Sequence, residues 1–73
     1  MTIKDLLKLC IPDVYFSIRL VDSEGVTIHK EMTTAERFTE NRPVYSKMEI
    51  EKLAVDKDYK EVVIFVKERN IHA

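Results

Sequence analysis

Apolar residues near the start of the chain recur at the spacing of one helical face. These residues are Ile3, Leu6, Leu7 and Cys10, which follow the spacing i, i+3, i+4 and i+7. Thr2 fits the N-cap of such a helix, and Asp5, three residues later, completes a capping-box pattern. Pro12 ends the helix, because its ring disfavours the helical conformation of the residue before it. The pattern therefore predicts an N-terminal helix whose apolar face, Cys10 included, is buried on a sheet.

The hydrophobic period then changes to strict alternation, which is typical of a half-buried strand. The inward positions of this strand are Val14, Phe16, Ile18 and Leu20. Residues 22–25 supply a turn, and Gly25, the only glycine of the chain, fits a left-handed position there. The return strand is expected to continue the inward face with Val26, Ile28 and Met32. His29 then points to the other face.

Residues 61–67 are the most β-like stretch of the chain, and they are apolar on both faces. One face carries Val62, Ile64 and Val66. The other face carries Val63 and Phe65. A strand with two apolar faces needs a cover on each side.

The expected partner of that strand is residues 48–55, where the apolar rhythm changes parity. A β-bulge near Glu51 and Lys52 would restore the register by adding one residue to this strand. A helix is the alternative, because residues 46–49 match a capping-box pattern. The residues that fit helical spacing are Ile50, Leu53 and Ala54. The sequence leaves strand and helix open here.

The connecting segment, residues 33–46, begins with a second capping-box pattern formed by Thr33 and Glu36. It predicts a short helix over residues 34–40, ended by Asn41 and Pro43. The predicted fold is therefore α+β: a four-stranded antiparallel sheet of two β-hairpins, with an N-terminal helix and a short connecting helix. A chain of 73 residues is expected to form a single compact domain, 1–73, with frayed residues from about 69.

Composition narrows the function classes. The 12 Lys and Arg against 13 Asp and Glu leave a net charge of −1, which gives no general attraction to nucleic acid or to an anionic membrane. Cys10 is the only cysteine, so no intrachain disulfide is possible and a reducing cytoplasm is expected. No apolar run reaches the roughly 20 residues of a membrane helix, and we expect no signal peptide.

The residue types of catalytic and metal sites are scarce. His29 and His72 are the only histidines, and neither has an evident nucleophile and orienting group beside it. One cysteine and two distant histidines do not make a zinc site, and a single glycine does not make a phosphate-binding loop. We therefore expect no enzymatic activity, no metal and no cofactor.

The second apolar face of residues 61–67 indicates a binding surface. Val63 and Phe65 are expected to face away from the N-terminal helix, where Phe38 of the connecting helix or a partner protein could cover them. Aromatic and arginine side chains are the types enriched at interface hot spots. The bound protein is either a second copy of this chain or a larger target. The candidate partner-binding residues are Arg37, Phe38, Arg42, Tyr45, Tyr15, Val63 and Phe65.

The opening TIKDLLKL, followed by a proline, a strand, an acidic-Gly turn and a late VVIFV strand, resembles short uncharacterised proteins encoded by bacteriophages and prophages. Many of these begin with a T-x-K-D/E-L-L helix. The resemblance covers roughly the first thirty residues and the last strand. It implies an accessory protein of a mobile element that binds and blocks a host machine, for which anti-CRISPR inhibitors of bacterial defence are an example. It implies no catalytic or binding residue.

These observations predict a non-enzymatic protein-interaction module that inhibits or adapts a larger host protein. The alternative is a homodimeric nucleic-acid-binding protein, in which basic side chains gather near Tyr15 and Tyr45. Those side chains would be Arg19, Lys30, Arg37, Arg42 and Lys47. Each is near an acidic residue in sequence, and interleaved charge is more typical of a solubilising surface.

Overall fold

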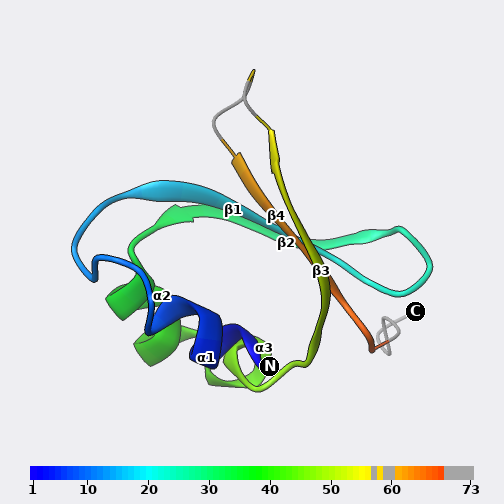
Figure 1. Cartoon of the computed structure of the whole chain (residues 1–73), viewed down its shortest axis with the longest axis horizontal. Coiled ribbons are helices and arrows are strands. Elements are labelled where there is room, and N and C mark those ends of the chain that lie inside the picture. The colour runs from blue at the N-terminus through cyan, green and yellow to red at the C-terminus, as the bar shows by residue number, and fades with distance from the viewer. Residues whose placement is uncertain (57, 59–60, 69–73) are drawn as a thin grey trace.

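The computed structural model describes residues 1–56, 58 and 61–68 (Figure 1). The elements in chain order are α1 (Ile3–Leu7), β1 (Phe16–Val21), β2 (Thr27–Thr33), α2 (Ala35–Asn41), α3 (Pro43–Ser46), β3 (Ile50–Asp56) and β4 (Glu61–Val66). The fraying predicted from about residue 69 lies outside the described residues. Within them, no helix has the length and apolar character that crossing a membrane requires.

The strands of the described part form a four-stranded sheet in the order β2-β1-β4-β3. β1 is antiparallel to β2, and β3 is antiparallel to β4, but β1 and β4 run parallel at the centre. The prediction of a purely antiparallel sheet is therefore wrong at this junction. The reason lies in α2 and α3, which carry the chain back along the sheet (Figure 1). β3 consequently starts at the same end of the sheet as β2 and runs in the same direction. Because β4 is antiparallel to β3, it runs in the direction of β1.

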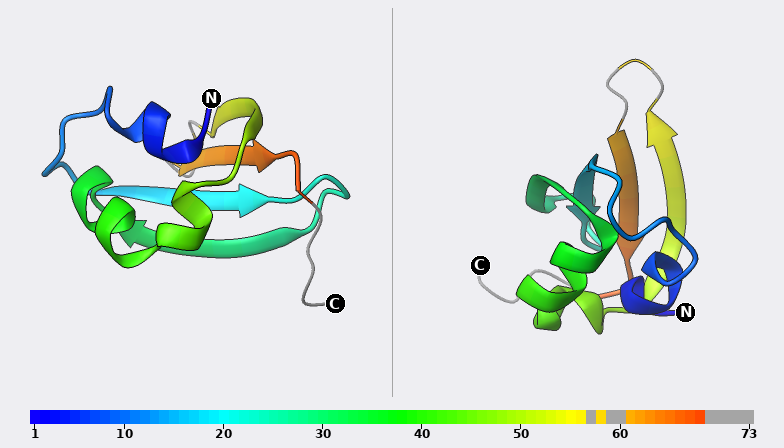
Figure 2. Two further views of the ribbon diagram at one scale, coloured as in Figure 1. Left: turned by 90° about the horizontal axis from the view of Figure 1, so that it is seen from below. Right: turned by 90° about the vertical axis from the view of Figure 1, so that its left-hand side faces the viewer.

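The helices lie on one face of the sheet (Figure 2). The buried core between the two layers consists of Ile3, Leu7, Ile18, Leu20, Ala35, Phe38, Ile64 and Val66. The predicted capping box of α1 is confirmed, because Thr2 Oγ1 accepts from Asp5 N and the Asp5 carboxylate accepts from Thr2 N. The helix ends earlier than expected, and Cys10 lies beyond it and is exposed. The prediction that Cys10 is buried is therefore wrong.

The inward face of β2 also differs from the prediction. The register sets His29 opposite Leu20 and Glu31 opposite Ile18, so these two polar residues lie on the helix-covered face. A bulge at Ile28 supplies the extra residue, because Val21 pairs with Thr27. A one-residue shift exchanges the faces of the strand beyond the bulge, and as a result Met32 lies on the face opposite the helices and is exposed. Val26 lies before β2 begins and is also exposed. His29 therefore points inward, opposite to its predicted direction.

Residues 50–56 form a strand, which decides between the two predictions for this segment. The register shifts between Ile50 and Lys52, with Glu51 as the extra residue, and this confirms the predicted bulge. Leu53 and Val55 then share the helix-covered face with residues of β4. They remain 47% and 66% exposed, respectively, because the helices do not extend over this part of β3 (Figure 2).

The connecting segment forms α2 as predicted and the additional short helix α3. The N-cap of α2 is Thr34, whose Oγ1 accepts a hydrogen bond from Arg37 N at 3.1 Å, and not the predicted Thr33. Pro43 begins α3. This segment packs on the core through Ala35 and Phe38.

Candidate functional site

The predicted partner-binding residues are not gathered at one place. Phe38 has no exposed surface and belongs to the core. Val63 and Phe65 lie on the sheet face opposite the helices, which we call the open face. The others divide between the edge of β2, with Arg42 and Tyr45, and the segment after α1, with Tyr15 and Arg37.

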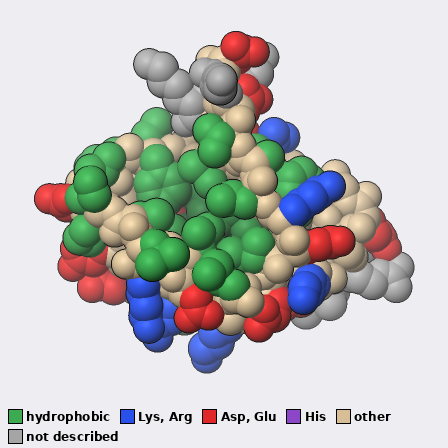
Figure 3. All heavy atoms as spheres, in the orientation of Figure 1, with side chains coloured by type: hydrophobic (Ala, Val, Ile, Leu, Met, Phe, Trp, Pro, Cys, Tyr) green, Lys and Arg blue, Asp and Glu red, His purple; other side chains and the backbone are tan. Residues whose placement is uncertain are grey.

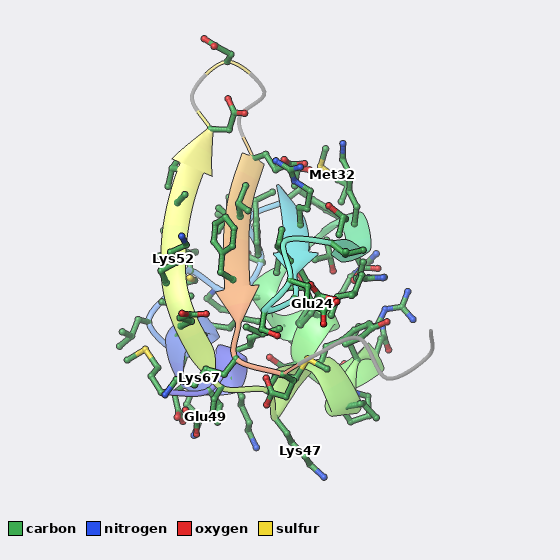
Figure 4. The ribbon with its side chains drawn as sticks, turned by 90° about the vertical axis from the view of Figure 1, so that its right-hand side faces the viewer. Glu24, Met32, Lys47, Glu49, Lys52 and Lys67 are labelled. Carbon is green, nitrogen blue, oxygen red and sulfur yellow. The ribbon has the colours of Figure 1, made fainter. Side chains whose placement is uncertain are left out.

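The open face is covered by its own side chains. Figure 4 looks onto it, with Lys52 projecting from β3 and the helices behind the strands. The Lys52 ammonium lies 4.6 Å from the centroid of the Phe65 ring, a cation–π contact. Val63 is only 5% exposed, although no helix of the described part covers this face. Phe38 does not reach Val63 and Phe65, so its predicted covering role is wrong.

A buried carboxylate organises the charges of the open face. Glu61 is 4% exposed, and its Oε1 lies 3.0 Å from Arg19 Nε, while its Oε2 lies 3.4 Å from Lys30 Nζ. Ser17 Oγ donates a hydrogen bond to Oε2 at 3.5 Å. Two cations thus neutralise one buried acid, as burial of a carboxylate requires. Arg19 and Lys30 are held by this acid.

A second charged group lies at the helix-covered side of β2, and we call it the β2 clamp: His29, Glu31, Arg42 and Tyr45. Arg42 donates from Nη2 to Glu31 Oε2 at 3.0 Å and from Nε at 3.3 Å. Burial disfavours the charged form of Glu31, but the hydrogen bond and charge of Arg42 outweigh it, and the pKa of Glu31 is lowered. His29 Nε2 lies 3.3 Å from Glu31 Oε2, and its ring is 4.9 Å from that of Tyr45. The clamp joins β2 to the helices.

The segment between α1 and β1 carries exposed apolar side chains. Leu9 is 77% exposed, Ile11 is 67% exposed and Val14 is 52% exposed. Tyr15 follows at 55%, with the Arg37 guanidinium 5.5 Å from its ring centroid. We call these five residues the loop surface. Figure 3 shows hydrophobic side chains gathered over this side of the molecule, from this segment across to β3.

The loop surface is held against α2. Glu36 N donates a hydrogen bond to Pro12 O at 3.2 Å. Two of the pockets in the described part lie between this segment and α2, with volumes of about 310 and 340 Å³, and both are lined in part by Glu36 and Glu40. The first also has apolar lining from Leu7 and Ala35. The surface thus combines apolar anchors with hollows that have acidic side chains in their lining.

Sequence reasoning found Tyr15 and Arg37 but missed Leu9, Ile11 and Val14 as surface residues. Val14 was assigned to the inward face of a strand that begins only at Phe16. A usable signal exists: three large apolar residues flank Pro12, a residue that ends the helix before it. Apolar side chains at such a break have no regular element to direct them inward.

No group of three or more His, Cys, Asp or Glu residues within residues 1–56, 58 and 61–68 could hold a metal ion. No protein-family model, no curated protein and no solved structure matches this chain. The geometry and chemistry of its own surfaces are therefore the basis for the function proposed below.

Proposed function

We propose that this chain is a non-enzymatic protein-interaction module and that it binds its partner through the loop surface. The observation that carries the proposal is the exposure of Leu9, Ile11 and Val14, at 77%, 67% and 52%, on a segment fixed to α2. Contiguous exposed apolar side chains lose water contact favourably when a partner covers them. The neighbouring Tyr15 and Arg37 are of the types that dominate binding energy in interfaces.

The surroundings of the loop surface define the chemistry of the partner. Asp13, Glu36 and Glu40 line the pocket beside Tyr15, together with Arg37. A complementary protein segment would place an aliphatic or aromatic side chain against Ile11 and a basic side chain beside these carboxylates. The partner is thus a protein with an apolar and basic surface, and not a membrane.

The specific form of the proposal is an inhibitor or adaptor of a larger host protein, encoded by a bacteriophage or another mobile element. It is supported by the resemblance of the opening helix and the last strand to phage-encoded accessory proteins. Anti-CRISPR proteins are an example of this class. Such a role requires a surface for binding and no catalytic group.

The test compares two aspartate substitutions of exposed aliphatic residues. Ile11→Asp changes the loop surface, and Val44→Asp changes α3 at a residue of similar exposure, 71%. Both variants should keep the wild-type circular dichroism spectrum. In affinity purification from a bacterial lysate, we expect a stoichiometric protein with wild type and Val44→Asp that is lost with Ile11→Asp. If every protein retained by wild type is also retained by Ile11→Asp, the loop surface is not the binding site.

The second candidate is nucleic-acid binding through the open face. Lys52 and the partly buried ring of Phe65 favour it, because basic and aromatic side chains on a sheet hold single strands by phosphate contact and stacking. Arg19 and Lys30 favour it less, since both contact Glu61. Retention on single-stranded DNA or RNA that falls steeply with salt, and that Phe65→Ala abolishes, would support this candidate over the first.

A further inference from the structure

The outer edge of β3 is free along most of its length. At its start, Met1–Ile3 lie beside it: Ile50 N donates to Met1 O at 2.8 Å, and Ile3 N donates to Met48 O at 3.0 Å. From Glu51 to Val55, no strand of the described part pairs with this edge. At its end, Asp56 Oδ1 accepts a hydrogen bond from Asp58 N at 3.0 Å. A free edge presents unpaired backbone N–H and C=O groups, which are a template for another strand.

We infer that a second copy of this chain pairs with β3 in antiparallel orientation, with a two-fold axis at Ala54. Residues directly opposite each other in an antiparallel pair share a face of the sheet. On β3, Leu53 and Val55 lie on the helix-covered face, whereas Lys52, Ala54 and Asp56 lie on the open face. A symmetric pairing must therefore be centred on a residue, and the helices of both copies lie on the same side of the joined sheet.

The pairing centred on Ala54 is complementary at every position from 52 to 56. It places Leu53 opposite Val55 of the second copy on the helix-covered face. It places Lys52 opposite Asp56 of the second copy on the open face. By symmetry each contact occurs twice. The strand therefore has the chemistry of a self-complementary sequence, KLAVD, with opposite charges at its ends and apolar residues between them.

The neighbouring symmetric pairings lack this match. Centred on Leu53, the pairing would place Val55 opposite Glu51 and would leave Lys52 opposite Ala54. Centred on Val55, it would place Ala54 opposite Asp56, and Lys52 would face Asp58, which lies in the turn beyond the end of β3. Each sets a charged side chain against an apolar one and forms no ion pair between residues of the two strands. The charge pattern therefore selects the Ala54 register.

Burial gives the pairing its driving force. Leu53 and Val55 are 47% and 66% exposed although they lie on the same face as the core residue Ile64. Pairing would cover both side chains and extend the core of each copy into the other. The contact involves one short strand from each copy, so we expect a dimer that dissociates on dilution. The loop surface is not part of this contact. An experiment can therefore disprove the dimer without disproving the proposed partner site, and the reverse.

Charge exchange tests the inference with the full chain. Lys52→Asp places two like-charged pairs in the contact, Asp56→Lys does the same with opposite sign, and the double variant restores two ion pairs in reversed order. Within one copy, residues four apart on a strand are too distant for an ion pair, so a rescue reports on the contact between copies. Sedimentation equilibrium over a concentration series measures the dissociation constant.

We expect a wild-type dimer, a dissociation constant raised about tenfold or more in each single variant, and recovery to near the wild-type value in the double variant. Wild type that stays monomeric up to millimolar concentration overturns the inference. A dimer that neither single variant weakens also overturns it. Weakening in both single variants without recovery in the double variant rules out the Ala54 register.

Discussion

At the residue scale, Glu31 connects the strand edge to the helices. It lies on the helix-covered face of β2, where alternation predicts an outward residue, and it is paired with Arg42 at 3.0 Å. The ion pair of Glu31 and Arg42 therefore links the sheet to the helices, with the rings of His29 and Tyr45 packed beside it. Stability should consequently depend on the charge of Glu31.

Because the pKa of Glu31 is lowered in the folded state, the unfolded chain binds more protons at acidic pH. The stabilisation by this residue is present above its unfolded pKa and is lost as the pH falls through the folded pKa. We expect Glu31→Gln to lose less free energy of unfolding than wild type between pH 6 and pH 3, measured from urea midpoints. Identical pH profiles for the two proteins would contradict this role.

Phe38 is the residue whose predicted and observed places differ most. It was expected at a binding surface but is fully buried between α2 and the sheet. We expect Phe38→Ala to lower the free energy of unfolding by about 3–5 kcal/mol, the cost of removing a buried aromatic side chain. The neighbouring exposed Arg37→Ala is the control and should change stability little. A loss below about 1 kcal/mol for Phe38→Ala would mean that the side chain is not packed in the core.

At the scale of elements, the start of α2 depends on one side chain. Thr34 Oγ1 accepts from Arg37 N, and Thr34 is 4% exposed. Thr34→Ala should cost about 1 kcal/mol in a chemical unfolding experiment, because an N–H of the first turn loses its acceptor. Thr34→Ser keeps the hydroxyl group and should retain most of the stability. Equal losses in the two variants would show that the methyl group matters and the cap does not.

Local patterns predicted those elements that are decided locally. The capping box at Thr2 and the short helix α2 follow from neighbouring residues. For residues 48–55 the local patterns left a bulged strand and a helix open, and the structure shows the strand. The parallel pairing of β1 and β4 could not be predicted, because it depends on the end of the sheet at which β3 starts after α2 and α3. The prediction of which residues of β2 point inward was wrong for a related reason, because the bulge at Ile28 leaves no signal in an alternating sequence.

The candidate site was predictable only in part. Tyr15 and Arg37 were identified by residue type, and they lie together at 5.5 Å. Leu9, Ile11 and Val14 were not identified, because exposure depends on where α1 ends and β1 begins. Val63 illustrates the reverse error: an apolar residue on an uncovered sheet face is buried by its neighbours and needs no partner.

At the scale of the whole molecule, the surfaces differ in what covers them. The helices cover one face of the sheet, and side chains cover the other. Exposed apolar side chains lie on the segment after α1 and on β3 (Figure 3), and others lie elsewhere on the surface, among them Met32 and Val44. In our account, β3 joins two copies and the loop surface binds an outside protein. A symmetric pair would present two loop surfaces on one joined sheet, which would increase the apparent affinity for a partner with two binding sites.

The most direct measurement is the affinity of the purified partner for wild type, Ile11→Asp and Val44→Asp, by isothermal titration calorimetry. We expect Ile11→Asp to weaken binding on the order of 30-fold, about 2 kcal/mol, as for an interface hot spot. Val44→Asp should bind like wild type. Equal affinities for wild type and Ile11→Asp, with both variants folded, would contradict the assignment of the loop surface as the binding site.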